Sequence, residues 1–220
     1  MLKIAVVDCG LGGEKFARYI EEQNAAVEVI RVIDWNPPKP YAKMNRRELR
    51  ARVEAQIRPY VGRVKLIVLW TNFVATSCLG YFRKKFPEQN FCGAQIQLNS
   101  GRTEKVVVLT SRAMKRSAKY REFRRSVPGK VMEVCCEDWL VPVNTGEITD
   151  AKMLAGLQRA VRFGPGLVIL GCSFLVFEER VIREAFGEDV TIDNGLAAGY
   201  CEVCRGLGLL GVDGRTRRGV

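Results

Sequence analysis

Short apolar runs alternate with longer charged or amphipathic segments along the chain. Residues 2–7, 26–33 and 65–70 are largely apolar and rich in Val and Ile, as buried parallel strands are. The segments between them predict helices over 14–23, 46–59 and 72–86, and a proline-rich loop over 34–41. This order of strand, loop and helix predicts an α/β fold with a parallel sheet.

The same order restarts about halfway along the chain. Three segments of the second half match segments of the first in order: 106–111 with 4–9, 138–139 with 34–35, and 169–174 with 68–73. The offsets are 102, 104 and 101 residues, and such a near-constant offset predicts a duplicated unit. We therefore expect two α/β domains, 1–96 and 97–205, with a polar linker near 95–104. Residues 206–220 are a candidate completion of the first domain.

The predicted strand ends suggest where a site would form. Ligands of open α/β sheets bind beyond the carboxyl ends of the strands. Small polar residues stand at these ends: Asp8, Cys9, Thr71, Asn72, Thr110, Ser111, Cys172 and Ser173. Two related domains facing each other would bring Thr71 and Cys172 to opposite sides of one cleft, which suits chemistry at both faces of a planar carbon.

Histidine is absent from the 220 residues, whereas cysteine occurs eight times. The absence of histidine excludes Ser-His-Asp and Cys-His catalytic pairs and histidine-ligated zinc. Acid–base chemistry must therefore use Cys, Asp, Glu, Lys or Tyr. The amino-terminal residues do not form a secretory signal, and the longest nearly apolar run, 167–177, is too short to span a membrane. We expect a cytoplasmic protein with reduced thiols.

Most of the cysteines are interpreted as structural. Cys78, Cys92, Cys135 and Cys136 fall in predicted helices or strands, and we expect them in the core. The Cys-x-x-Cys motif at 201–204 has no second pair at zinc-ribbon spacing. We therefore interpret it as two small apolar side chains on a terminal helix and expect no metal site.

The positive charge of the chain is concentrated in one segment. Lys and Arg number 35 against 24 Asp and Glu, a net charge of +11, and residues 112–130 alone carry +7. Such a segment fits either a nucleic-acid-binding helix or a solvated helix face. No recognition motif or interleaved aromatic pattern accompanies it, so we favour the solvated face.

The motifs at the strand ends resemble those of glutamate racemase and the wider Asp/Glu racemase superfamily, over residues 4 to about 199. In the first half, residues 8–13 resemble the family's Asp-Ser-Gly-x-Gly-Gly turn. Asp34 with Pro40, Tyr41 and Ala42 resembles its Asp…Pro-Tyr-Gly loop, and residues 69–73 stand where the family has Ala-Cys-Asn-Thr.

The second half carries the remaining matches. Thr110, Ser117 and Tyr120 match a Thr…Ser…Tyr pattern of the family, and residues 140–143 match its Val-Pro-Leu segment. Residues 170–174 resemble Leu-Gly-Cys-Thr-His. Six motifs in the family's order carry the resemblance.

The resemblance implies two pseudosymmetric α/β domains with the site in the cleft between them. It also implies proton transfer, without a cofactor, at the carbon alpha to the carboxylate of a small amino acid or related acid, by two cysteines that flank this carbon. Carried over by position, Cys172 and Asp8 are catalytic. The substrate-binding set is Pro40, Tyr41, Ala42, Thr71, Asn72, Phe73, Thr110 and Ser173. The oligomeric state stays open, with a homodimer as one candidate.

Several positions depart from the family pattern. Thr71 replaces the first catalytic cysteine, Phe174 replaces the histidine after the second, and the family's glutamate corresponds to Asn144 or Thr145. A threonine hydroxyl is too weak an acid to act as a base near neutral pH. Cys9, in the family's serine position, is the candidate replacement.

Three functional hypotheses follow from these departures. The first is an active racemase-like enzyme. The second is a one-cysteine, decarboxylase-like or non-catalytic paralogue that binds a small carboxylate. The third, a nucleic-acid-binding protein that uses the basic segment at 112–130, is the least favoured.

Overall fold

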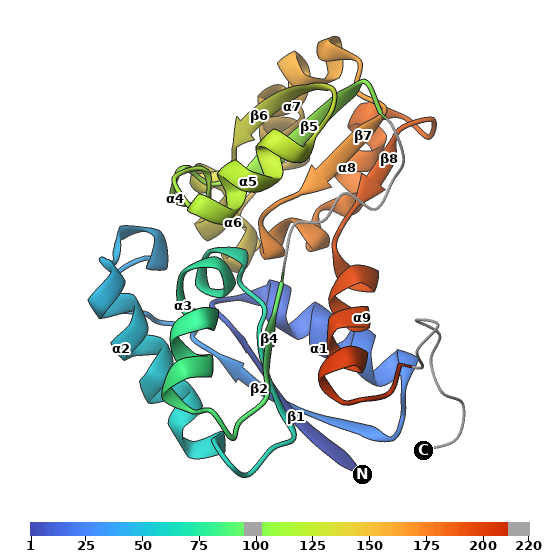
Figure 1. Cartoon of the computed structure of the whole chain (residues 1–220). Helices are drawn as coiled ribbons and strands as arrows, with labels where there is room; N and C mark the ends of the chain where they lie inside the picture. The colour runs from blue at the N-terminus through green and yellow to red at the C-terminus, as the bar shows by residue number, and fades with distance from the viewer. Residues whose placement is uncertain (95–102, 211–220) are drawn as a thin grey trace. The chain divides into compact units, whose positions relative to one another are not determined.

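The computed structural model describes residues 1–94 and 103–210, which fall into two compact units (Figure 1). The first unit joins the amino-terminal residues to the segment that begins at Leu196, and the second ends at Gly195. Each unit holds a four-stranded parallel sheet. Most of the expected linker at 95–104, and residues 211–220 of the expected completion, lie outside the described residues.

The first unit has the strand order β2-β1-β3-β4, with helices between successive strands. Its strands are β1 (Leu2–Asp8), β2 (Val27–Ile33), β3 (Leu66–Leu69) and β4 (Phe91–Gly93). Its helices are α1 (Leu11–Gln23), α2 (Arg46–Ile57), α3 (Asn72–Lys85) and α9 (Leu196–Gly206), with short 3-10 turns η1 (Tyr41–Lys43) and η2 (Arg58–Tyr60). Strand β1 pairs with both β2 and β3, so the chain first adds a strand on one side of β1 and then crosses to its other side. The direction in which strands are added therefore reverses between β1 and β3.

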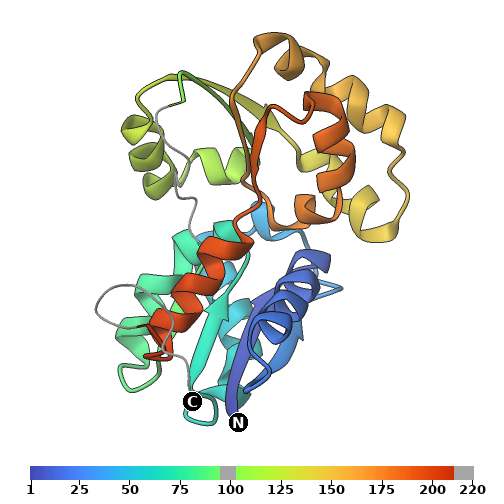
Figure 2. The ribbon, with the colours of Figure 1, turned by 90° about the vertical axis from the view of Figure 1, so that its right-hand side faces the viewer.

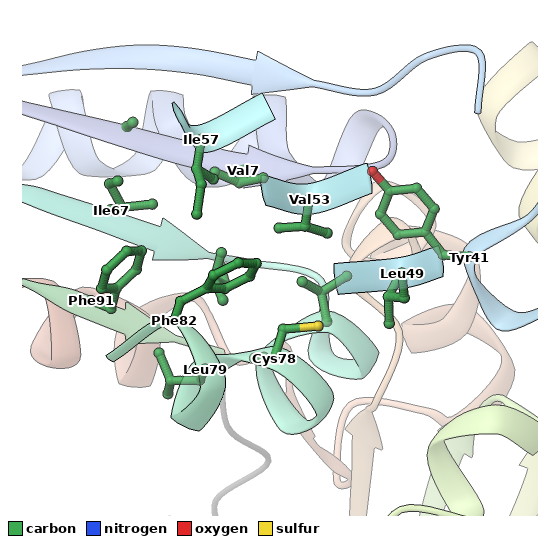
Figure 3. Close-up of a cluster of buried hydrophobic side chains, with 14 of the residues drawn as sticks. Val7, Tyr41, Leu49, Val53, Ile57, Ile67, Cys78, Leu79, Phe82 and Phe91 are labelled. Carbon is green, nitrogen blue, oxygen red and sulfur yellow. The ribbon is translucent and has the colours of Figure 1, made fainter. Parts of the chain in front are cut away.

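Apolar side chains of α2 and α3 cover one face of this sheet. Val53 and Ile57 from α2 and Phe82 from α3 are fully buried there against Val7 and Ile67 of the strands (Figure 3). Burying a side chain of this size contributes about 1.5–3 kcal/mol, so the face is held mainly by the hydrophobic effect. Helix α2 starts at a capping box between Asn45 and Glu48.

Helix α9 packs on the first unit, against β3, β4 and α1, and Figure 2 shows this red helix beside them. The ring of Phe16 stacks on that of Trp70 with centroids 3.5 Å apart, and Gly199 of α9 lies directly against both rings. A Cβ atom at position 199 would collide with the Trp70 ring, so glycine permits the close approach. The sequence placed residues 196–205 in the second domain, and this packing puts them in the first.

The second unit repeats the arrangement of the first, in the order β6-β5-β7-β8. Its strands are β5 (Lys105–Thr110), β6 (Lys130–Cys135), β7 (Leu167–Leu170) and β8 (Thr191–Asp193). Its helical segments are α4 (Arg112–Lys115), α5 (Ala118–Ser126), η3 (Glu137–Trp139), α6 (Leu140–Thr145), α7 (Asp150–Phe163), η4 (Ser173–Phe177) and α8 (Glu179–Phe186). The shared order agrees with the duplication that the sequence matches predict.

The two faces of this second sheet are covered by different helices. Val106 and Val108 of β5 point to the face covered by α4 and α5, and Val107 and Leu109 point to the face covered by α7 and α8. Cys78, Cys92 and Cys136 are buried as expected. Cys135 is exposed, contrary to expectation, because it ends β6 at the edge of the sheet.

All eight cysteines are free thiols. Within residues 1–94 and 103–210, no helix is both long enough and apolar enough to cross a membrane.

Candidate functional site

The carboxyl ends of β1 and β3 bring three of the predicted site residues together in the first unit. Asp8 is the last residue of β1, Cys9 follows it, and Thr71 follows β3 and precedes α3. These two strands are neighbours and flank the point where the strand order reverses. Ligands of doubly wound sheets bind at such a switch point.

The three residues form a hydrogen-bonded cluster, which we call the Asp8–Thr71–Cys9 cluster. The Thr71 hydroxyl donates to the Asp8 carboxylate, and the Cys9 backbone N–H donates to Asp8 Oδ1 at 2.7 Å. The Cys9 sulfur lies 3.6 Å from Thr71 Oγ1. The Thr71 hydroxyl has a single proton, so at any moment it can donate either to Asp8 or to the Cys9 sulfur.

The surroundings keep Cys9 protonated. Burial raises the pKa of the Cys9 thiol, and the negative charges of Asp8 and Asp34 raise it further. A hydrogen bond donated by Thr71 lowers this pKa, by less than burial or Asp8 raises it. Asp8 itself is 1% exposed, so the cluster has a buried carboxylate at its centre.

A second network fixes the loop after β2. Arg52 of α2 binds both oxygens of Asp34, with Nε to Oδ2 at 2.8 Å and Nη2 to Oδ1 at 2.6 Å. The Tyr41 hydroxyl donates to Asp34 Oδ2 at 2.7 Å. Burial opposes ionisation of Asp34, yet the hydrogen bonds from Arg52 and Tyr41 hold the pKa of this carboxyl below its usual value.

The other predicted residues of the first unit lie next to these two groups. Pro40 and Ala42 flank Tyr41 in the chain, and the Pro40 carbonyl accepts from Lys43 N at 2.8 Å. Asn72 and Phe73 start α3 directly after Thr71. Arg52 was not singled out from the sequence, because a basic residue in a charged helix carries no signal of the buried carboxylate that it binds.

The second unit holds the other predicted residues at the equivalent strand ends. Thr110 ends β5, and Cys172 and Ser173 follow its neighbour β7. Cys172 is half-buried, and burial, then the charges of Glu137 and Cys135, raise its pKa to about 12. Thr110 is fully buried, and its hydroxyl has no hydrogen-bond partner among the described residues.

Glu137 is the carboxylate whose charge acts on Cys172. Its Oε1 accepts from the backbone N–H groups of Arg112 and Ala113, at 2.7 and 3.3 Å, at the start of α4. The position of the family's glutamate, by the motif match, holds Asn144 or Thr145, at the end of α6. Glu137 comes before the matched segment at 140–143, whereas the family's glutamate comes after it, so the motif match does not point to Glu137.

The predicted residues thus form one group in each unit. The Asp8–Thr71–Cys9 cluster and Tyr41 belong to the first unit, and Thr110, Cys172 and Ser173 to the second. That a single cleft joins the two groups stays a prediction. Among the residues that the structure describes, His, Cys, Asp and Glu form no group of three that could hold a metal ion.

Comparison with known proteins gives a consistent result. The chain is 27% identical over 218 residues to glutamate racemase from Mycobacterium leprae, covering 94% of this chain and 79% of that protein. Escherichia coli glutamate racemase, solved with L-glutamate and the activator UDP-MurNAc-Ala, superposes with a TM-score of 0.80 at 20% identity, over 94% and 82% of the two chains. Aspartate racemase from Picrophilus torridus has a TM-score of 0.64 at 15% identity, over 94% and 95%. No family model matches the chain.

Two parallel sheets of the same order, each with small polar residues at the carboxyl ends of its central strands, define the chain as a two-unit α/β protein with the Asp/Glu racemase fold. The similar sequences point more narrowly than the fold does. The chain is similar in sequence to glutamate racemases, at 26–27% identity over most of its length.

Proposed function

We propose that this protein catalyses cofactor-independent proton transfer at the carbon alpha to the carboxylate of a small amino acid, as a racemase-like isomerase, with Cys9 and Cys172 as the proton-transferring groups. The observation that carries the proposal is the distance of 3.6 Å between the Cys9 sulfur and Thr71 Oγ1. A thiol thereby lies beside the position at which the family's first cysteine is missing.

The class of substrate is proposed from the relatives. Solved glutamate racemases similar to this chain contain L-glutamate, D-glutamate or β-chloro-D-alanine. All three ligands have a carboxylate and an amine on the carbon that would exchange its proton. We therefore propose a small amino acid of this type as the substrate.

The proposed step is a proton transfer in two parts. Cys172, as a thiolate, takes the α-proton, and the electron pair of the broken C–H bond moves toward the carboxylate to give an enediolate. The Cys9 thiol then returns a proton to the opposite face of the carbon. At the end Cys172 is a thiol and Cys9 a thiolate, which is the arrangement needed for the reverse reaction, so the protons balance.

Thr71 and Asp8 are proposed to act through Cys9. While Cys9 is a thiol, the Thr71 hydroxyl donates to Asp8. When Cys9 becomes a thiolate, the same hydroxyl can turn and donate to sulfur, which stabilises the anion. Thr71 is thus a positioning residue, and it need not ionise.

The raised pKa values of both thiols bear on the chemistry in two opposing ways. At neutral pH the thiolate is rare, because burial favours the neutral form of Cys9 and of Cys172. A thiolate with a higher pKa is, however, a stronger base toward a weakly acidic C–H bond. We therefore expect a slow enzyme near neutral pH whose rate rises with pH.

Replacement of each thiol tests the residue assignment. The α-proton signals of D- and L-glutamate and of D- and L-aspartate are followed by NMR in D₂O with wild type, Cys172→Ala and Cys9→Ser. We expect Cys172→Ala to lower exchange at least about 100-fold, the scale of general acid–base catalysis. Cys9→Ser should abolish inversion, while exchange with retention of configuration can persist.

Cys201→Ser is the matched control, because Cys201 is an exposed thiol of α9. It should exchange protons at the wild-type rate. Full activity of Cys172→Ala, or unchanged inversion by Cys9→Ser, would contradict the assignment of that residue. If no variant or wild type exchanges protons while an amino acid still raises the melting temperature, the proposed activity is wrong and the protein only binds the ligand.

A further inference from the structure

The proposed function does not use the basic segment of the second unit, residues 112–130. Two of its cations have acidic partners within the unit: Arg112 pairs with Glu137 at 3.3 Å and Lys115 with Glu133 at 2.6 Å. Five others lie on α5 or just before it, and we call them the basic α5 surface: Arg116, Lys119, Arg121, Arg124 and Arg125. All are exposed except Arg124, which is half-buried.

The packing of α5 directs this surface to solvent. Tyr120 is buried against Val106 and Val108, its hydroxyl donates to Glu133 at 2.8 Å, and Phe123 packs on the same cluster. The apolar side of the helix is therefore used by the core. Arg121 and Arg125 are four residues apart, so they lie one above the other on the outer side.

The basic α5 surface makes no close ion pairs with the residues that the structure describes, although the charge of Arg124 also acts on Glu133. Within residues 1–94 and 103–210, none of its five cations has a carboxylate within ion-pair distance, and Glu122 is the one acid inside the segment. Like charges one helical turn apart destabilise a helix slightly. An anionic partner would remove this repulsion.

We propose that the basic α5 surface binds the phosphate backbone of double-stranded nucleic acid, without sequence specificity. Four of its five cations are arginines, whose planar guanidinium groups match phosphate oxygens in a two-point contact. Helix α5 has 9 residues, and at about 1.5 Å per residue it is about 13 Å long. A duplex carries one negative charge per about 1.7 Å, so about eight charges lie within that length.

Two other anionic partners fit less well. A helix that lies on a membrane needs an exposed apolar side, but none of the large exposed apolar residues of the described chain falls within 112–130. Single-stranded nucleic acid is usually bound by exposed aromatic side chains that stack on bases. The two aromatic residues of α5, Tyr120 and Phe123, pack into the core instead.

The proposal is independent of the racemase-like function, because it uses none of the site residues. Its test measures binding of the full chain to a fluorescently labelled 24-base-pair DNA by anisotropy, at several salt concentrations between about 50 and 200 mM. A matching RNA duplex, a single strand of the same length, and vesicles with anionic lipid are measured in parallel.

The decisive variant is Lys119→Gln/Arg121→Gln/Arg125→Gln. The matched control is Arg47→Gln/Arg63→Gln/Lys84→Gln, which removes the same charge from exposed positions of the first unit. Each phosphate contact contributes about −0.9 to the slope of log K against log salt. We expect the α5 variant to weaken binding at least about tenfold and to make the slope shallower by about 2 to 3, with little change in the control.

Three outcomes would overturn the proposal. One is the absence of duplex binding at about 50 mM salt. Another is an equal loss of affinity in the two variants, because the net charge of the chain, and not the basic α5 surface, would then account for binding. The third is tighter binding to anionic vesicles or to the single strand than to either duplex. Melting curves of both variants verify that they are folded.

Discussion

Replacing Thr71 by valine removes the hydroxyl that connects Asp8 to Cys9 and keeps the branched shape of the side chain. A hydrogen bond to a charged group contributes about 1.5–3 kcal/mol to stability. Asp8 is 1% exposed, but its Oδ1 also accepts from the Cys9 N–H at 2.7 Å, a hydrogen bond that does not use the Thr71 side chain. We therefore expect the lower part of this range, a loss of about 1.5–2 kcal/mol in the free energy of unfolding.

Differential scanning calorimetry measures this loss. For a chain of this size, 1 kcal/mol corresponds to about 2–4 °C in melting temperature, so Thr71→Val should melt about 3–8 °C lower. Thr71→Ser is the matched control, because it keeps the hydroxyl and loses one methyl group, worth about 0.8 kcal/mol when buried. Equal melting temperatures of Thr71→Val and wild type would refute the hydrogen bond to the buried carboxylate.

The reactivity of the Cys9 thiol tests the role of Thr71 separately from its contribution to stability. The hydrogen bond with Thr71 lowers the pKa of Cys9, against the larger effect of burial. Its removal therefore raises that pKa, and at a fixed pH below the pKa the thiolate fraction falls tenfold for each unit by which the pKa rises. Cys9 of Thr71→Val should react more slowly with iodoacetamide than Cys9 of wild type or Thr71→Ser, with the exposed Cys201 as an internal reference. Unchanged reactivity would remove Thr71 from the proposed role.

Three further predictions follow from other parts of the structure. Because the pKa of Cys172 is raised to about 12, the rate of proton exchange should rise almost tenfold per pH unit between about pH 7 and 9; a plateau in that range would contradict the assignment. Gly199→Ala should lower stability by about 1–3 kcal/mol, because its Cβ meets the Trp70 ring, whereas Gly80→Ala on the open side of α3 should be neutral or slightly stabilising; equal urea midpoints would contradict this. The pKa of Asp34 is lowered, so its ion pair stabilises the fold above the unfolded value near 3.8 and loses this effect as pH falls through the folded pKa. Asp34→Asn should therefore lower the free energy of unfolding by about 1–3 kcal/mol at neutral pH. The loss is modest because Arg52 is partly exposed, so that water screens the ion pair. The difference in stability from wild type should shrink below about pH 4.

The hydrophobic pattern predicts the central strands β1, β3, β5 and β7 best, because a strand buried on both faces is apolar throughout, whereas it set no bounds for the edge strands β4, β6 and β8. The expected strand at 65–70 is β3 at Leu66–Leu69, with all four residues buried. The expected helix at 46–59 ends at Ile57 and continues as a 3-10 turn. Pro59 explains the early end, because it has no N–H to donate to the preceding turn.

Contacts between distant segments could not be predicted in the same way. The residues of α9 are small and moderately apolar, which predicts a helix but not the sheet that it covers. Its place depends on whether the surface around Phe16 and Trp70 can receive Gly199, which only the folded structure shows. For this reason the boundary of the second domain was predicted ten residues too late.

The candidate site was predicted in part. Strand ends gave Asp8, Cys9 and Thr71, because parallel strands bring their carboxyl ends to one edge. The supporting charges Arg52 and Glu137 come from a helix and a turn that have no motif, so no spacing could relate them to Asp34 or Cys172.

Solvent exchange at the α-carbon tests the central claim of proton transfer most directly. Wild-type protein is incubated in D₂O with each enantiomer of glutamate and aspartate, and NMR and chiral chromatography follow deuterium and configuration together. The proposed mechanism predicts deuterium at the α-carbon of at least one of these amino acids, together with its mirror image. Complete retention of the α-proton in all four amino acids, at enzyme concentrations close to theirs, would contradict it.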